Sequence, residues 1–426
     1  MRRNILVNVG FWCIVMVLTF TANDARAQGS LNYLHILTGD DGEEPIGGVV
    51  LDSKGNLYGT TRYGGASSLS CPFLDSCGTV FELSPNGSSG WIYQTLYNFT
   101  GGADGAAPSG DLVLDSLGNV YGTTYAGGLP GSPPTCAYQG CGTVFELSHS
   151  SGDWELTTLH SFNGSDGANP WSGVIRDSAG LLYGTTSFVG TVFALAPSKS
   201  GWKFSTLYSG GGYPYGGLTM DASGNLYGTV SQGGYLKCLS GTGCGAVFEF
   251  SRSTGKIKLS VLHIFKGYAY GDGAMPMGKL LIDSAGAIYG TTEWGGLTSS
   301  DCVNQVGCGT VFKLSHSSGT WQEQVLHGFS GADGYNPTGY LAMDSAGNLY
   351  GTTSGCGTVC GQCGTVFVLT PNGTSWQFQT LYDFSLVAGG FTPMGGITLD
   401  SSGNLFGTTE YSQPFGTYGT VFALRP

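Results

Sequence analysis

Three polar residues interrupt a repeated position of the sequence that is otherwise glycine. Asp111, Lys279 and Tyr340 each stand four residues before the aspartate of a recurring L-D-S-x-G-N-L-Y motif. Arg176 interrupts a second position, otherwise apolar, directly before another copy of that aspartate. These four side chains are suited to polar contacts with a ligand. If the chain is an enzyme, we expect them to serve a lyase or hydrolase reaction.

Aromatic side chains are the second group of candidates. Trp171 and Trp294 lie outside the position where tryptophan recurs with the repeat. Tyrosines stand beside them or in comparable segments, namely Tyr63, Tyr125, Tyr215 and Tyr335. Only 10% of the residues are charged, and exposed aromatic rings on such a surface can stack on sugars or hold a protein partner. The alternative is that they only cover the backbone of their own loops.

Cysteines recur as close pairs just before a repeated G-T-V-F segment. The expected disulfides are Cys71–Cys77, Cys136–Cys141, Cys238–Cys244, Cys302–Cys308 and Cys356–Cys363. A pair that recurs at one place of an exported chain indicates local disulfides. A zinc site would need several pairs to converge, so we expect no metal site. Cys360 competes for Cys363, which leaves the last pairing open.

The histidines and a second series of aspartates follow the repeat. Four histidines occupy one position, where other copies have tyrosine: His35, His160, His263 and His327. This pattern indicates an aromatic slot that packs at the rim of a sheet. The aspartates stand in D-G segments between repeats, at Asp41, Asp104, Asp166, Asp272 and Asp333. Turn formation is their expected role.

The motif aspartates mark seven copies of one unit, at Asp52, Asp115, Asp177, Asp221, Asp283, Asp344 and Asp400. We expect each of them to accept backbone N–H groups in a tight turn. In the first copy, four strand-like segments span residues 47–52, 56–61, 79–84 and 91–99. Four such segments in a repeat of roughly 60 residues are typical of a β-propeller blade.

The two ends of the chain complement each other. The last copy stops before its fourth segment, and residues 31–36 form such a segment alone at the start. We therefore expect an all-β, seven-bladed β-propeller with four antiparallel strands per blade, closed by the N-terminal strand. The first strand of each blade then lines a central channel. The long connections between strands share the face of the channel mouth.

Residues 1–27 have the features of a secretory signal peptide, with Arg2 and Arg3, an apolar run and the sequence Ala25-Arg26-Ala27. The propeller domain is then residues 28–426 of a secreted or periplasmic protein that is not inserted in a membrane. We expect no C-terminal anchor, since the sequence ends on a repeat. The net charge of −12 disfavours nucleic acid as a partner, and we expect a monomer.

Residues 108–147 begin with P-x-G-x-L-x-x-D-S-x-G-N-V-Y-G-T-T and continue with G-G and C-G-T-V-F. This unit resembles the GloVer tandem repeat of exported bacterial proteins, in the choice-of-anchor family. The resemblance implies a surface or secreted propeller without an established activity and with varied C-terminal anchors. The first half of the unit is also similar to NHL-type propeller repeats, which serve as interaction platforms and less often as lyases.

We interpret the chain as a binding or interaction protein whose ligand, a glycan or a surface protein, meets the long-loop face. The alternatives are a propeller enzyme with its site at the channel mouth, and a structural component of the cell envelope. A metal-dependent lactonase is disfavoured, because the first strands are mostly Gly, Val, Leu, Ile and Thr rather than converging carboxylates. No G-x-S-x-G, H-E-x-x-H or phosphate-loop motif is present, and we expect no cofactor.

Overall fold

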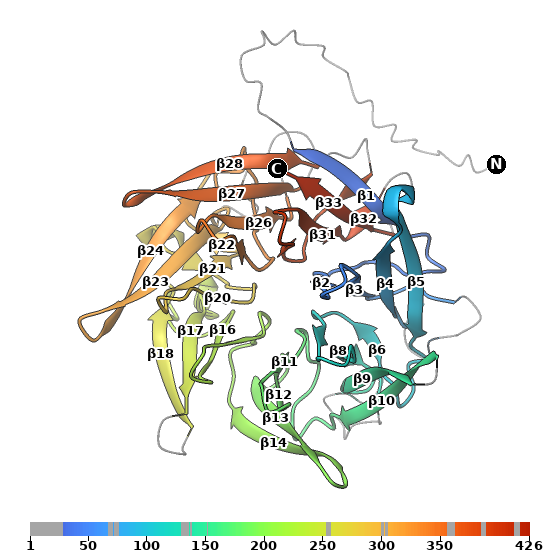
Figure 1. Ribbon diagram of the computed structural model, residues 1–426. Helices are drawn as coiled ribbons and strands as arrows, with labels where there is room; N and C mark the ends of the chain where they lie inside the picture. The colour runs from blue at the N-terminus through green and yellow to red at the C-terminus, as the bar shows by residue number, and fades with distance from the viewer. Residues whose placement is uncertain are drawn as a thin grey trace, which may run out of the picture.

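The computed structural model describes residues 29–66, 71, 76–128, 136, 139–150, 152–252, 257–299, 302, 306–355, 363–384, 389–412 and 418–426. Seven antiparallel sheets stand around a central axis like the blades of a propeller (Figure 1). The chain passes once around the ring, from the blue N-terminal strand to the red C-terminal blade in Figure 1. The expected seven-bladed β-propeller is thereby confirmed.

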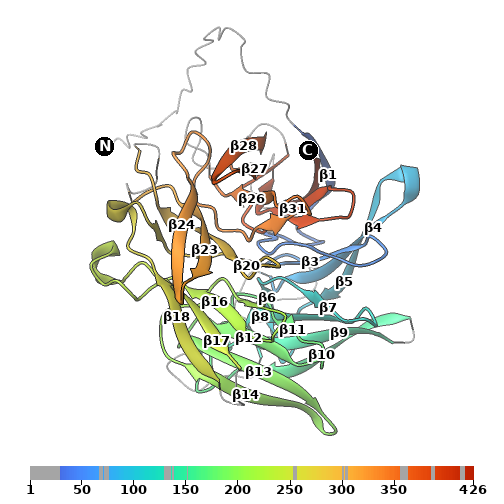
Figure 2. The same cartoon turned by 60° about the vertical axis from the view of Figure 1, so that its left-hand side comes forward.

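Each blade has four main strands. From the axis outward they are, in blade 1, β2 (Val50–Leu51), β3 (Leu57–Thr61), β4 (Thr79–Pro85) and β5 (Trp91–Asn98); in blade 2, β7 (Val113–Leu114), β8 (Val120–Ala126), β9 (Thr143–Ser150) and β10 (Asp153–Ser161); in blade 3, β11 (Ile175–Arg176), β12 (Leu182–Thr186), β13 (Thr191–Ser198) and β14 (Gly201–Ser209); in blade 4, β15 (Leu218–Met220), β16 (Leu226–Val230), β17 (Ala246–Ser251) and β18 (Lys258–Ile264); in blade 5, β20 (Leu281–Ile282), β21 (Ile288–Thr292), β23 (Thr310–Ser317) and β24 (Thr320–Gly328); in blade 6, β25 (Ala342–Met343), β26 (Leu349–Thr353), β27 (Thr365–Asn372) and β28 (Ser375–Asp383); and in blade 7, β30 (Thr398–Leu399), β31 (Leu405–Thr409), β33 (Thr420–Arg425) and β1 (Ser30–Ile36). The two outer strands of blade 3, β13 and β14, form a hairpin that projects from the ring in Figure 2.

Short additional strands lie in the long connections. They are β6 (Ala106–Pro108), β19 (Gly273–Ala274), β22 (Trp294–Gly295), β29 (Gly390–Phe391) and β32 (Tyr411–Ser412). The 3-10 turns η2 (Leu239–Gly241) and η4 (Tyr268–Tyr270) also lie in long connections, whereas η1 (Gly87–Ser89) lies in the turn between β4 and β5. β19 precedes blade 5 and pairs with β22, which follows the second strand of that blade. The connection between blades and the loop within a blade therefore meet on one face, as expected.

The repeat motifs account for the local structure of a blade. The phenylalanine of G-T-V-F packs on the glycine of L-Y-G-T-T. In blade 1 the ring of Phe81 lies so close to Gly59 that a side chain on Gly59 would overlap it. The motif aspartate holds the inner turn, since Oδ1 of Asp52 accepts the backbone N–H groups of Lys54 and Asn56, each at 2.8 Å. All seven motif aspartates make this pair of bonds. The predicted turn role is confirmed.

The ring is closed by strands from opposite ends of the chain. β1 pairs with β33, with Leu31 opposite Leu424. Nearer the axis, the Thr408 hydroxyl donates to the carbonyl oxygen of Gly47 at 2.8 Å. The equivalent threonine of blade 5, Thr291, makes the same bond to the next blade at 3.0 Å. Closure thus repeats a contact that joins neighbouring blades elsewhere.

Four of the predicted disulfides are present, with Cα–Cα distances between 4.9 and 5.6 Å: Cys71–Cys77, Cys136–Cys141, Cys238–Cys244 and Cys302–Cys308. The fifth, Cys356–Cys363, and the leader over residues 1–27 involve residues outside the described ranges. Four disulfides suggest an oxidising extracellular environment. Among the described residues, none of the helical segments has the length and apolar character needed to span a bilayer.

Candidate ligand-binding site at the channel mouth

The mouth of the channel is built by the same short segment in every blade. Each connection between blades ends in proline, one variable residue, glycine or serine, and a second variable residue, which lies just before the innermost strand. The first variable residues are Ile46, Ser109, Trp171, Tyr215, Met277, Thr338 and Met394, and they line a cavity of about 100 Å³. We call it the mouth cavity.

The second variable residue of each segment lies one step deeper. Asp111, Lys279 and Tyr340 line the mouth cavity together with glycines from other blades. Asp111 Oδ1 accepts the backbone N–H of Gly48, in the neighbouring blade, at 2.9 Å. The Tyr340 hydroxyl lies 3.5 Å from the Thr398 hydroxyl. The structure therefore brings three of the four polar candidates to one place.

Burial governs the ionisation of this group. It raises the pKa of the Asp111 carboxyl, although the charge of Lys279 and the Gly48 N–H act in the opposite direction. Burial, followed by the nearby Asp111 carboxylate, raises the pKa of Tyr340 well above its usual range, so the phenol stays protonated and can donate a hydrogen bond. The mouth cavity therefore offers an acceptor, a cation and a neutral donor to a ligand.

Arg176 does not join this group. It lies in β11, four residues beyond Ser172, the last blade-3 residue that lines the mouth cavity. Its guanidinium lies 5.9 Å from the centre of the Tyr121 ring, in the preceding blade. Of the four polar candidates, Arg176 is the one that does not line the mouth cavity, because its side chain lies against the preceding blade.

Four of the six aromatic candidates form one cluster beside the mouth cavity. Trp171 meets Tyr125 and Tyr215 edge-on, with ring centres 5.6 and 5.9 Å apart. Arg62 joins Tyr63 to this group, since its guanidinium lies 5.0 Å from the Tyr63 ring and 5.1 Å from the Trp171 ring. All four rings are half-buried, so each keeps an accessible surface. We call these four residues the aromatic rim.

The other two aromatic candidates lie elsewhere. Trp294 is partly buried and packs against the core cluster between blades 4 and 5, which contains Cys238 and Leu280. Tyr335 is only 7% exposed, and its ring covers Gly355. The expectation that Tyr335 is an exposed loop residue is wrong, because the short strand-like contact between residues 335 and 355 turns its ring inward.

Sequence reasoning missed several residues of the mouth. Ile46, Met277 and Met394 occupy the same segment position as Trp171, and P-x-G spacing alone would have found them. Arg62 was missed because no other blade has arginine after L-Y-G-T-T. Ile46, Met277 and Met394 make the edge of the mouth cavity more apolar than its floor, which Asp111, Lys279 and Tyr340 form.

We call the repeated position that holds His35, His160, His263 and His327 the histidine slot. The histidines there do more than pack at the rim of a sheet. In three blades the histidine Nε2 contacts an aspartate of the following connection: His35–Asp41 at 2.7 Å, His160–Asp166 at 3.0 Å and His327–Asp333 at 2.8 Å. The same aspartates accept backbone N–H groups of that connection, which confirms their expected turn role. Rim packing alone was an incomplete prediction, since each pair also ties a blade to the connection that follows it.

Comparison with known proteins gives a family match. A model of the Gloeobacter/Verrucomicrobia repeat matches residues 18–240 and 235–426. No curated protein matched the sequence. Among solved structures, a putative 6-phosphogluconolactonase from Bacteroides uniformis is similar at 14% identity and a TM-score of 0.49, over 77% of this chain and 84% of that one.

Two further solved structures show similar likeness. A protein from Lactobacillus plantarum has 12% identity and a TM-score of 0.49, over 82% of this chain and 95% of that one. A putative oxidoreductase (glucose dehydrogenase) from Thermus thermophilus has 14% identity and a TM-score of 0.42, over 75% and 96%. The family match covers both halves of the sequence, and the chain belongs to the Gloeobacter/Verrucomicrobia repeat family.

Proposed function

We propose that this protein is exported and binds a glycan at the mouth cavity. The observation that carries the proposal is the aromatic rim beside a polar floor, where Trp171 contacts Tyr125, Tyr215 and Arg62 and also lines the cavity. Half-buried aromatic faces suit the apolar face of a sugar ring, and Asp111 and Lys279 suit its hydroxyl groups. A concave mouth favours one end of a small ligand over a flat protein surface.

Export is supported by two separate features. Residues 1–27 combine basic residues, an apolar run and an A-x-A sequence. The four disulfides are of the kind that persists in an oxidising compartment. Mass spectrometry of protein recovered from the culture medium or periplasm tests this part, and a mature N-terminus at Gln28 is the expected result.

Glycan binding is tested with the purified, oxidised protein on a glycan array, followed by calorimetry with the best ligand. Trp171→Ala is expected to remove binding, whereas Trp171→Phe retains part of it. Tyr268→Ala is the control, because Tyr268 is 47% exposed and lies in η4 rather than at the mouth. Equal affinity of the Trp171→Ala variant and the unmodified protein contradicts the proposal.

A second candidate function is catalysis at the same place. It is favoured by the meeting of Asp111, Lys279 and Tyr340 from three different blades at one cavity. A protonated phenol, a carboxylate and an ammonium group provide an acid, a base and a cation for a lyase or hydrolase. Turnover in a substrate screen that is lost in Lys279→Ala, with ligand binding retained, would favour the enzyme.

A further inference from the structure

The histidine slot follows a rule that involves the next blade. In three of the four blades with histidine, the outer strand of the next blade places an aromatic ring flat against it. The stacked pairs are His35–Tyr93, His160–Phe204 and His327–Phe378, with ring centres 3.9, 4.0 and 4.1 Å apart. Each pair therefore has an aspartate at the histidine Nε2 and an apolar lid on the ring.

Blade 4 breaks this rule. Glu323 of β24 occupies the position that holds Tyr93, Phe204 or Phe378 in the other blades, so a carboxylate faces His263. One ligand atom each from His263, Asp272 and Glu323 lies within 4.8 Å of the other two. Oε1 of Glu323 is buried and has no hydrogen-bond partner in the described part of the chain. A buried carboxylate oxygen without a partner is costly unless something binds it.

The geometry around His263 differs from that of the stacked histidines. Nε2 of His263 lies 3.4 Å from the Asp272 carboxylate, compared with 2.7–3.0 Å in the other three pairs. Tetrahedral ligands of a zinc ion lie roughly 3.4 Å from one another, so this pair already has the required separation. A rotation of the Glu323 side chain would bring in a third oxygen and leave one coordination position open to water.

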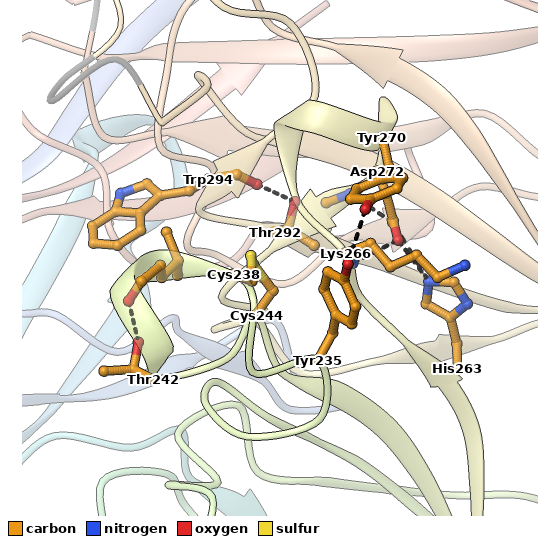
Figure 3. The surroundings of a disulfide bond; sticks show 12 residues. Tyr235, Cys238, Thr242, Cys244, His263, Lys266, Tyr270, Asp272, Thr292 and Trp294 are labelled. Atoms are coloured by element: carbon orange, nitrogen blue, oxygen red, sulfur yellow. Dashed lines mark hydrogen bonds and ion pairs between the residues drawn. A yellow bond between two sulfur atoms is a disulfide. The ribbon is translucent and has the colours of Figure 1, made fainter.

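The Asp272 carboxylate is held firmly in place. It accepts the backbone N–H groups of Lys266 and Gly273 at 2.8 and 2.7 Å, and the residue is only 7% exposed. The disulfide Cys238–Cys244, whose surroundings Figure 3 shows, lies so close to the same connection that a side chain on Gly267 would overlap its sulfur atoms. The Lys266 side chain extends beside His263 in Figure 3 and is exposed, so its ammonium group can turn into solvent.

We propose that His263, Asp272 and Glu323 form an open binding site for a divalent transition-metal ion of the zinc type. One imidazole and two carboxylates form a donor set that suits zinc better than calcium, which takes oxygen ligands alone.

The test is calorimetric titration of the oxidised protein with Zn²⁺, and with Ca²⁺ in parallel. The unmodified protein is expected to bind one Zn²⁺ at this site and to prefer it to Ca²⁺. Glu323→Phe restores the aromatic lid of the other blades and so preserves packing. Since even residues that only orient a ligand cost roughly 10–100-fold in affinity, we expect a loss of about 100-fold or more.

A matched variant introduces the proposed metal site into a blade whose histidine is stacked on an aromatic ring. Phe378→Glu places a carboxylate over His327, which already contacts Asp333, and is expected to raise the stoichiometry by one Zn²⁺. Equal Zn²⁺ affinity of the unmodified protein and Glu323→Phe, or tighter binding of Ca²⁺, would overturn the proposal. Trp171→Ala leaves Zn²⁺ binding unchanged, which separates this site from the mouth cavity.

Discussion

The ring of Tyr340 lies directly over the backbone of Gly396, which occupies the same repeat position in the next blade. A side chain on Gly396 would overlap the ring, and one on Gly48, one blade further, would overlap the Tyr340 hydroxyl. One large residue at the mouth of the channel thus depends on two neighbours that have no side chain. The glycines of this position leave room for the polar residues that interrupt them.

This dependence predicts a coupled pair of substitutions. Gly396→Ala is expected to destabilise the protein by about 1–3 kcal/mol, because the added methyl group overpacks the space beneath the ring. Tyr340→Ala in the same chain removes the clash and is expected to recover most of that loss. Urea denaturation of both single variants and the double variant measures the coupling. Purely additive effects would show that the ring can move aside at no cost.

The fold could be predicted because the same turn motif and strand pattern occur seven times in the sequence. Each motif aspartate needs only its own turn, as Asp52 shows with Lys54 and Asn56. Ring closure could be predicted because residues 31–36 repeat a segment that the last copy lacks. Local turn chemistry and a strand count do not depend on distant contacts, so one sequence contains all the information required.

The site was only partly predictable, because side-chain direction depends on packing between blades. Asp111 and Lys279 were found through their register, which the repeat supplies. Arg176 and Tyr335 were misplaced, since the direction of each side chain is set by the surrounding packing. Glu323 was missed for a related reason. It can be recognised as a candidate ligand only beside His263, which lies 60 residues earlier in the sequence and in the preceding blade.

Ring closure predicts a strong effect of the first strand on stability. Deletion of residues 1–36 removes β1 and exposes the edge of β33, whereas deletion of residues 1–28 leaves the pair intact. The longer deletion is expected to lower the melting temperature by on the order of 10 °C and to promote association through the open edge. Calorimetry and light scattering compare the two chains. A longer deletion that melts unchanged as a monomer would show that seven complete blades are not required.

The histidine–aspartate pairs predict sensitivity to acid. Burial favours the neutral form of Asp333, but hydrogen bonds from His327 and from the Ser330 N–H outweigh it and lower the pKa of the carboxyl below its usual 3.8. A carboxyl whose pKa is lowered on folding stabilises the protein above pH 4, and this contribution is lost as the pH falls further.

Asp333→Asn is therefore expected to cost about 1–2 kcal/mol at pH 7 and much less at pH 3. Urea midpoints at both pH values provide the measurement, and Asp153→Asn, at an exposed position, serves as the control. The same loss at pH 3 and pH 7 would mean that the charge of Asp333 does not contribute.

Two half-buried glutamates predict the opposite trend at higher pH. Burial raises the pKa of Glu293 and of Glu410 to about 7, from a usual value of 4.5. Between pH 4.5 and 7 the folded protein holds protons that the unfolded chain has released, so stability falls as the pH rises through this range. The lowered aspartate pKa values do not oppose the trend, because those groups titrate below it.

Glu293→Gln removes one of these charges and is expected to flatten the decline and to stabilise the protein at pH 8. Adding Glu410→Gln in the same chain is expected to flatten it further. Glu155→Gln, at an exposed position of β10, is expected to leave the slope unchanged. Urea midpoints at pH 5, 6, 7 and 8 measure the slope for each variant. Parallel curves for the unmodified protein and Glu293→Gln would show that Glu293 is ionised in the folded protein throughout this range, and that its burial is compensated by water.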